Sequence, residues 1–310
     1  MFATLLGALP RPRLPSDGPR HALVHDAVRA QEAAGLDPIT DGGSPAGTNV
    51  DRDNTHGVGD SWRATQDLTE RAVKQAIAGP YSTAHNGAVA ADRRQATLDR
   101  AMALNATLRE LAAAGCPLIE VHEPAAVAIG ADEGERILFR EAQLRLLDGV
   151  HDSHLSLAIT GGNADAAGIE TILAAPYASL AVDLIAGPDN WRLVVDTPGE
   201  RGIICGALSP AGTSDDGPEL LLWAAAYAAS TGGRGPARVG LASASSLAHL
   251  SWEVAVGKLQ RLGDAARLAE ESPDTRILSL DPRAVSSRSA ALGHVEPRPS
   301  RRPDRADEQT

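Results

Sequence analysis

Short apolar runs that end at turn residues alternate with helical stretches along most of this 310-residue chain. Runs of this length, rich in Val, Ile and Leu, are typical of buried β-strands. The pattern predicts eight strands, at about Phe2–Gly7, Asp37–Thr40, Val73–Ala78, Leu118–His122, His154–Ile159, Leu180–Val182, Gly202–Cys205 and Arg238–Leu241.

Helical patterns fill the segments between these strands. The clearest spans Thr97–Ala114, where leucines recur on one helical face and Gly115 stands where a C-terminal cap belongs. Further helices are expected at His21–Ala34, Glu135–Leu147, Ala167–Ala174, Pro218–Ser230 and Leu247–Leu268.

This alternation predicts an α/β fold, a single (β/α)₈ barrel, because such barrels usually take about 250 residues. An open doubly wound sheet is the alternative. Its common nucleotide-binding forms lack support, since no G-x-G-x-x-G follows the first strand and no G-x-x-x-x-G-K-[ST] occurs. We expect the barrel over residues 1–271 and a tail over residues 272–310, whose Pro- and Arg-rich composition predicts disorder.

Composition narrows the classes of partner. Only 3% of residues are aromatic although 43% are hydrophobic, so the core must be built from Ala, Leu, Val and Ile. The net charge is −11, and no basic stripe with interleaved aromatic residues precedes the tail. Both features argue against nucleic acid or a membrane surface as partner. A small-molecule ligand is expected, and the oligomeric state stays open.

The cysteine content and the N-terminal sequence indicate the cellular compartment of the protein. Cys116 and Cys205 are the only cysteines, which fits a reducing compartment. The opening MFATLLGALPRPRLP has no basic start, and its apolar run is too short for a signal peptide or a membrane span. We therefore expect a cytoplasmic protein.

Polar residues follow the predicted strands at their carboxyl ends, where barrels form their active sites. His122 and Glu123 end one apolar strand, and His122 suits a general acid, a general base or a hydrogen-bond donor to a ligand. The predicted catalytic residues are His122, Glu123, Asp183 and Cys205. The predicted substrate-binding residues are Arg11, Asp41, Thr160, Asn163, Ser209 and Ser243. Cys205 could act as a nucleophile only if a neighbouring positive charge lowered its pKa.

Two loops could also contribute to a functional site. The long polar segment Asp41–Ser61 could form a lid. The turn Thr160–Asp165 (TGGNAD) could cradle a carboxylate or phosphate with its N–H groups, or it could be a tight turn with Asn163 or Asp165 as helix N-cap. No C-x-x-C or H-x-C spacing links the candidate ligands, so no metal is predicted.

Four segments together resemble the C-terminal catalytic barrel of cobalamin-independent methionine synthase. They are LLGALPRP (Leu5–Pro12), QEAAGLDPITDGG (Gln31–Gly43), VKQAIAGPYS (Val73–Ser82) and LAAAGCPLIEVHEPA (Leu111–Ala125). Their order and spacing agree from about residue 2 to residue 268. The resemblance implies a barrel of the methionine synthase and uroporphyrinogen decarboxylase type.

The resemblance also implies which functional residues have changed. In the family, a zinc ion held by a His-x-Cys pair, a Glu and a Cys activates homocysteine to take a methyl group from a folate. The matching positions here are Ala158, Thr160, Asp183 and Ser243. The family's homocysteine-binding and acid positions fall at Ala8, Gly43, His122 and Ala207, where His122 replaces a carboxylate that binds the substrate's amino group. No cofactor is predicted, and folate stays an open question.

Three functions follow. The first is a methyltransferase-like enzyme of altered chemistry that acts on a small anionic metabolite, because a histidine suits an acid, a phosphate or a carbonyl better than an ammonium group. The second is a non-catalytic relative that binds a metabolite or a partner protein. The third is a homocysteine S-methyltransferase with a displaced metal site.

Overall fold

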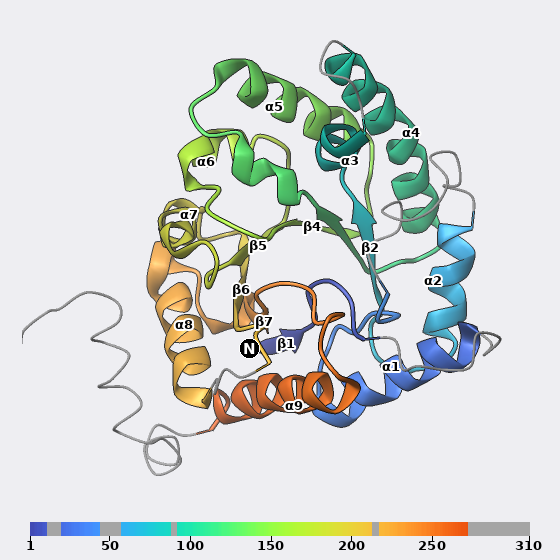
Figure 1. Cartoon of the computed structure of the whole chain (residues 1–310), viewed down its shortest axis with the longest axis vertical. Helices are drawn as coiled ribbons and strands as arrows, with labels where there is room; N and C mark the ends of the chain where they lie inside the picture. Colours follow the sequence, from blue (N-terminus) through green and yellow to red (C-terminus); the bar gives the residue numbers. More distant parts are fainter. Residues whose placement is uncertain (11–19, 44–56, 88–91, 213–216, 272–310) are drawn as a thin grey trace, which may run out of the picture.

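A curled parallel sheet forms the centre of the molecule (Figure 1). The computed structural model describes residues 1–10, 20–43, 57–87, 92–212 and 217–271. Within these ranges seven strands follow the order β1-β7-β6-β5-β4-β3-β2. The strands are β1 (Phe2–Thr4), β2 (Lys74–Ala78), β3 (Leu118–His122), β4 (His154–Ile159), β5 (Ser179–Asp183), β6 (Gly202–Leu208) and β7 (Val239–Ser243).

Helices surround the outer face of the sheet, as Figure 1 shows. They are α1 (Arg20–Ala34), α2 (Val58–Gln66), α3 (Pro80–Gly87), α4 (Arg93–Ala113), α5 (Glu133–Leu147), α6 (Ile169–Ile172), α7 (Trp191–Asp196), α8 (Pro218–Ser230) and α9 (Trp252–Leu268). The short helices α2, α3 and α7 were not predicted, because none is long enough to show a clear apolar period. None of the helices in the described ranges has both the length and the apolar character needed to cross a bilayer.

The predicted second strand is the main difference from the expected barrel. Residues 37–40 contribute only an isolated bridge, which joins Ile39 to Val73. The N–H of Asp37 donates to Ala3 O and the N–H of Lys74 donates to Ile39 O, so the segment reaches both edge strands. Pro38 has no N–H to donate, which limits a regular ladder here. The fold is therefore a curled seven-stranded parallel sheet over the described residues, and the eighth strand is not confirmed.

Two apolar regions lie on the two faces of the sheet. The larger region fills the space between the strands and the helices. The smaller region lies inside the curl and consists of Leu6, Ala158, Ala181, Ile204 and Ala242. Barrel interiors are usually filled by large branched side chains. Three of these five residues are alanine, so this interior is filled less completely.

The first strand of the chain pairs with β7, the last strand in the described ranges, and forms one edge of the sheet. We call this β1–β7 pairing the seam. Phe2 lies opposite Gly240, and Thr4 lies opposite Ala242. Just beyond β1, Ser243 Oγ donates to Leu6 O over 3.1 Å and accepts from Leu6 N over 3.3 Å. Ser246 Oγ makes the same pair of bonds with Ala8. Side chains therefore extend the seam past the point where the backbone ladder ends.

Two further expectations are corrected, and others lie outside the described residues. Ser61 belongs to α2, so the polar loop predicted for Asp41–Ser61 ends earlier than expected. Strand β6 runs on to Leu208, which places Cys205 in the middle of a strand and not after its end. Arg11, residues 44–56 of the predicted lid and the tail from residue 272 lie outside the described residues.

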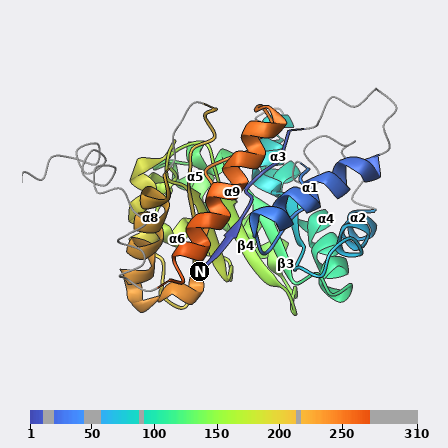
Figure 2. The same cartoon turned by 90° about the horizontal axis from the view of Figure 1, so that it is seen from below.

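Helix α9 covers the seam and packs beside α1 (Figure 2). Gly263 in α9 faces the carbonyl oxygen of Ala34, and a methyl group at Gly263 would overlap that oxygen. Gly257, in the same helix, has no atom close to the position of an added methyl group. Close approach of the two helices therefore depends on glycine at one position only.

The two glycines provide a matched test of this packing. We expect Gly263→Ala to lower the free energy of unfolding by about 1–3 kcal/mol, since the added methyl overpacks the contact. Gly257→Ala should raise it by about 0.5–1 kcal/mol, the usual gain of alanine over glycine in a helix. Urea unfolding followed by circular dichroism measures both, and similar effects of the two variants would contradict the packing described.

Candidate functional site

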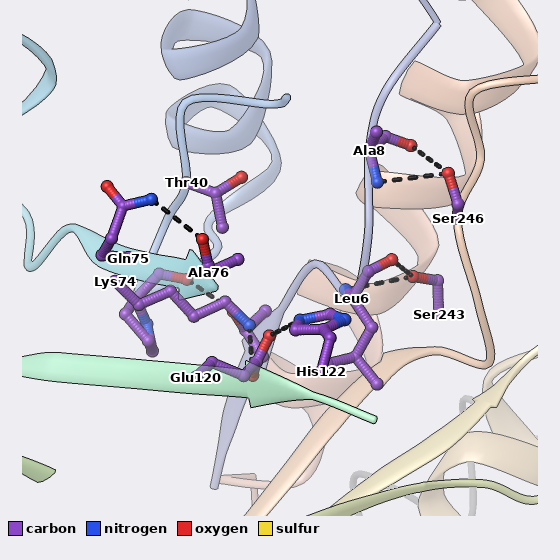
Figure 3. Close-up of polar contacts among 12 residues, drawn as sticks. Leu6, Ala8, Thr40, Lys74, Gln75, Ala76, Glu120, His122, Ser243 and Ser246 are labelled. Atoms are coloured by element: carbon purple, nitrogen blue, oxygen red, sulfur yellow. Dashed lines mark hydrogen bonds and ion pairs between the residues drawn. The ribbon is translucent and has the colours of Figure 1, made fainter. Parts of the chain in front are cut away.

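Three charged or titratable side chains meet inside the curl of the sheet (Figure 3). Lys74 Nζ lies 2.8 Å from Glu120 Oε2, and His122 Nε2 lies 2.8 Å from Glu120 Oε1. Their side chains are 1%, 2% and 8% exposed, respectively. We call Lys74, Glu120 and His122 the interior cluster.

Strand alternation explains why these residues point inward. In β3, Leu118, Glu120 and His122 share one face, while Ile119 and Val121 are fully buried under the helices. The register sets Ala76 of β2 opposite Glu120, so Lys74 is a diagonal neighbour two residues earlier. The long lysine side chain spans that diagonal.

The electrostatics of the cluster fix the charge of Glu120. Burial alone would raise the pKa of Glu120, but the charge of Lys74 and the hydrogen bond from His122 outweigh burial and hold the pKa at about 2. Burial lowers the pKa of Lys74, and Glu120 offsets part of that effect. Glu120 is therefore an ionised carboxylate held between two nitrogen donors.

The charge of Glu120 also decides the roles of the two ring nitrogens of His122. An ionised carboxylate only accepts hydrogen bonds, so Nε2 of His122 carries the proton that lies toward Glu120. Nδ1 has no hydrogen-bond partner among the residues that the structure describes. An imidazole held by a carboxylate through one nitrogen can exchange a proton with a ligand through the other. This geometry lies at the carboxyl end of β3, where barrels carry out their chemistry.

Glu123 follows His122 in sequence, but its carboxylate has different partners. Its oxygens accept hydrogen bonds from Tyr81 N (3.1 Å), Ser82 N (2.7 Å) and Gln143 Nε2 (2.7 Å). The first two donors are unpaired N–H groups in the first turn of α3, which favour a carboxylate. Burial raises the pKa of Glu123, although these hydrogen bonds oppose the shift. The structure thus places Glu123 beneath α3 and does not bring its carboxylate to His122.

Asp183 is likewise occupied by backbone donors. Its carboxylate accepts from Gly161 N (3.0 Å), Ile185 N (2.9 Å) and Ala186 N (2.8 Å). Gly161 belongs to the turn that was expected to cradle an anion, and the carboxylate bound there is the chain's own. Asp183 therefore joins the loops that follow β4 and β5.

The other residues of that turn also bond within the protein. Asn163 Oδ1 accepts from Asp189 N over 2.9 Å, and its Nδ2 donates to Asp189 Oδ2 over 3.2 Å. The N-cap of the following 3₁₀ turn is Ala164, so the alternative with Asn163 or Asp165 in that place is wrong. Thr160 is half-buried at the end of β4.

Cys205 and Ser243 face structural partners. Cys205 is fully buried and its Sγ lies 3.8 Å from Ala224 O of α8. Burial raises the pKa of Cys205 to about 12, and the charge of Arg234 opposes this only in part, so the lowered pKa that a nucleophile needs is not present. Ser243 is fully buried and bonds to Leu6 in the seam.

Asp41 and Ser209 shape their own loops. Asp41 Oδ1 accepts from Gly43 N over 2.9 Å, and Ser209 Oγ accepts from Ala211 N over 3.2 Å. Both residues are half-buried. Of the predicted site residues in the described ranges, His122 is the one that the structure places in the interior cluster.

The residues at the family's zinc positions do not fit a tetrahedral site. Asp183 is held by three N–H groups, and Ser243 is tied to Leu6. Within the described ranges, no group of three or more His, Cys, Asp or Glu side chains is arranged to hold a metal ion.

Sequence reasoning missed Lys74 and Glu120. A signal was present, because each is a charged residue in a mostly apolar strand, and Glu120 lies two residues before His122. In a strand buried on both faces, such a residue must find an opposite charge on a neighbouring strand.

Acid should weaken this cluster through Glu120. Since its folded pKa is about 2 and the usual value is 4.5, its stabilisation is present above about pH 4.5 and is lost as the pH falls toward 2. We expect Glu120→Gln to lower the free energy of unfolding near pH 6 by about 3–5 kcal/mol, because Lys74 is left unpaired. The difference from wild type should shrink as the pH falls, in urea titrations between pH 2 and pH 6.

Glu123 is unchanged in this comparison, so its raised pKa affects both proteins alike. The double variant Lys74→Met/Glu120→Gln is the control, and it should recover part of the loss because the unpaired ammonium is gone. A pH-independent difference between wild type and Glu120→Gln would contradict the assignment.

Part of the sequence matches a known protein family. Residues 48–155 match the family model described as cobalamin-independent synthase, catalytic domain. That range contains β2 and β3, and hence the whole interior cluster. Among curated proteins, none matches the sequence significantly.

Several solved structures share the fold. A B12-independent methionine synthase from Shewanella sp. W3-18-1, in complex with selenomethionine, has a TM-score of 0.69 and 16% identity, covering 90% of this chain and 99% of that chain. A protein assigned as a vitamin-B12-independent methionine synthase from Listeria monocytogenes has a TM-score of 0.66 and 14% identity, covering 88% and 98%. A methyltransferase from Methanosarcina mazei has a TM-score of 0.50 and 16% identity, covering 68% and 64%.

At these identities the structures show a common fold, and the family match over residues 48–155 rests on the sequence. The resemblance of this chain to the catalytic domain of cobalamin-independent methionine synthase is therefore confirmed.

Proposed function

We propose that the protein is an enzyme of altered chemistry that binds a small anionic metabolite at the carboxyl ends of its strands. His122 exchanges a proton with the ligand through Nδ1. Glu120 positions the ring through Nε2, and Lys74 balances the charge of Glu120. The observation that carries the proposal is the ionised Glu120 carboxylate 2.8 Å from His122 Nε2.

The energetics of burial support a catalytic role over an inert scaffold. Replacing buried ion pairs by apolar groups of similar volume is often neutral or stabilising, so stability alone gives little reason for the cluster. An enzyme needs such an arrangement, because a proton-transfer group must be held in one orientation with one nitrogen available.

The identity of residue 122 supports an anionic ligand. The similar Shewanella synthase is bound to selenomethionine, which is an amino acid. The resemblance sets His122 where the family has a carboxylate for the amino group. Because Nε2 donates to Glu120, Nδ1 can donate to a carboxylate or phosphate only when the ring is an imidazolium, and an imidazolium repels an ammonium group.

The segment 37–40 completes the surroundings of this site in our proposal. It bonds to β1 through Asp37 and to β2 through Ile39 and Lys74. We propose that it takes the place of the eighth strand and closes the barrel beside the cluster. His122 would then lie at the mouth of an enclosed barrel.

Experiments can distinguish two alternative functions from the proposed one. A non-catalytic relative would bind a metabolite or partner without dependence on the protonation of His122. A homocysteine S-methyltransferase with a displaced metal site would retain about one zinc ion per chain, which elemental analysis of the purified protein detects. The proposed function expects no stoichiometric zinc.

A pair of matched ligands tests the preference for an anion without an amino group. Methionine and 4-(methylthio)butanoate have the same carbon skeleton and differ in the ammonium group. We expect the wild-type protein to bind 4-(methylthio)butanoate more tightly, and His122→Asp to reverse the preference by restoring a carboxylate. The reversal should be about tenfold or more in the ratio of dissociation constants, the effect of one charge-assisted hydrogen bond. Isothermal titration calorimetry at pH 7 measures all four affinities.

Cys205→Ser serves as the control, because Cys205 lies against α8 and should leave the preference unchanged. Tighter binding of methionine than of its des-amino analogue by the wild-type protein would overturn the proposed ligand class.

A further inference from the structure

A cavity of about 350 Å³ opens at the opposite end of the sheet from His122. Its wall is formed by residues at or just before the starts of the strands, among them Phe2, Lys74, Leu118 and Gly202. Several residues of the wall have small side chains, among them Ser156, Ser179 and Gly202, and they leave the interior open at this end. This volume is in the range of small-molecule sites.

Two polar groups in the wall are available to a ligand. Ser156 is 1% exposed, and its Oγ has no hydrogen-bond partner in the described part of the chain. A buried hydroxyl without a partner is costly, so such a group usually marks a bound molecule or a functional site. Lys74 also lines the cavity, and its Nζ gives one of three N–H donors to Glu120.

The charges in the wall favour an uncharged ligand. Lys74 is already neutralised by Glu120 at 2.8 Å, so a charged ligand would bring an unbalanced charge into a buried space. At the entrance Glu200 and Arg238 contribute one charge of each sign. The rest of the wall includes the apolar residues Phe2, Leu118 and Ile204.

We propose that this cavity is a second binding site, which takes a small uncharged molecule with an apolar ring or chain and a hydroxyl or carbonyl group. The polar group of the ligand bonds to Ser156 Oγ and Lys74 Nζ, and its apolar part contacts Phe2 and Ile204. The site goes beyond the proposed function, because it opens at the amino ends of the strands and His122 is not part of its wall.

Three probes of similar shape test the ligand class. Cyclohexanol, cyclohexanecarboxylate and cyclohexylammonium share one ring and differ in charge. We expect saturable binding of cyclohexanol in calorimetric or ligand-detected NMR titrations, and weaker binding of both charged probes. Ser156→Ala should weaken cyclohexanol binding about two- to tenfold, the effect of one neutral hydrogen bond.

Two variants that occupy the cavity in different ways complete the test. Ser156→Leu fills the interior, and Ala178→Trp covers the entrance from an exposed position, so it should leave the fold intact. Both should abolish cyclohexanol binding, while His122→Asn should retain it, which separates this proposal from the proposed function. The proposal is overturned if cyclohexanol does not saturate, if a charged probe binds more tightly, or if Ala178→Trp binds like wild type.

Discussion

The curl of the parallel sheet determines which side chains can reach one another, and within it the pairing of β1 with β7 joins the first strand of the chain to the last described one. Alternate side chains of each strand are directed into a shared interior. Ser243 and Ser246 extend the β1–β7 pairing by bonding to the chain beyond β1. A charged residue in that interior has little access to water and must find its partner on another strand.

Glu120 is the residue through which this constraint becomes a functional arrangement. It accepts hydrogen bonds from Lys74 on one side and from His122 on the other. The lysine keeps the carboxylate ionised, and the ionised carboxylate fixes the orientation of the imidazole. Glu123, one residue beyond His122, faces the other way and stabilises the first turn of α3. Neighbouring residues at one strand end thus have separate roles in ligand chemistry and in stability.

The sequence predicts the strands well, because apolar runs bounded by turn residues are a local signal. Leu118–His122 and His154–Ile159 begin and end as expected. The segment 37–40 was predicted as a strand but contributes only an isolated bridge. Strand pairing depends on contacts between residues that are distant in sequence, and a local pattern does not reveal them. Position at a strand end was predictable for His122 and Asp183, but the hydrogen-bond partners were not. The carboxylate of Asp183 accepts hydrogen bonds from the N–H groups of Gly161, Ile185 and Ala186. The loop geometry that brings these groups together cannot be read from the spacing of residues in the sequence.

The position of the proton on the His122 ring decides whether Nδ1 can serve the ligand. Two-bond ¹H–¹⁵N NMR correlations of the imidazole, recorded at a pH where the ring is neutral, show which nitrogen carries the proton. We expect a proton on Nε2, directed to Glu120, and an unprotonated Nδ1 in the neutral ring. Glu120→Gln should remove this strict preference. A neutral ring protonated on Nδ1 in the wild-type protein would contradict the account, because the nitrogen offered to the ligand would then be the wrong one.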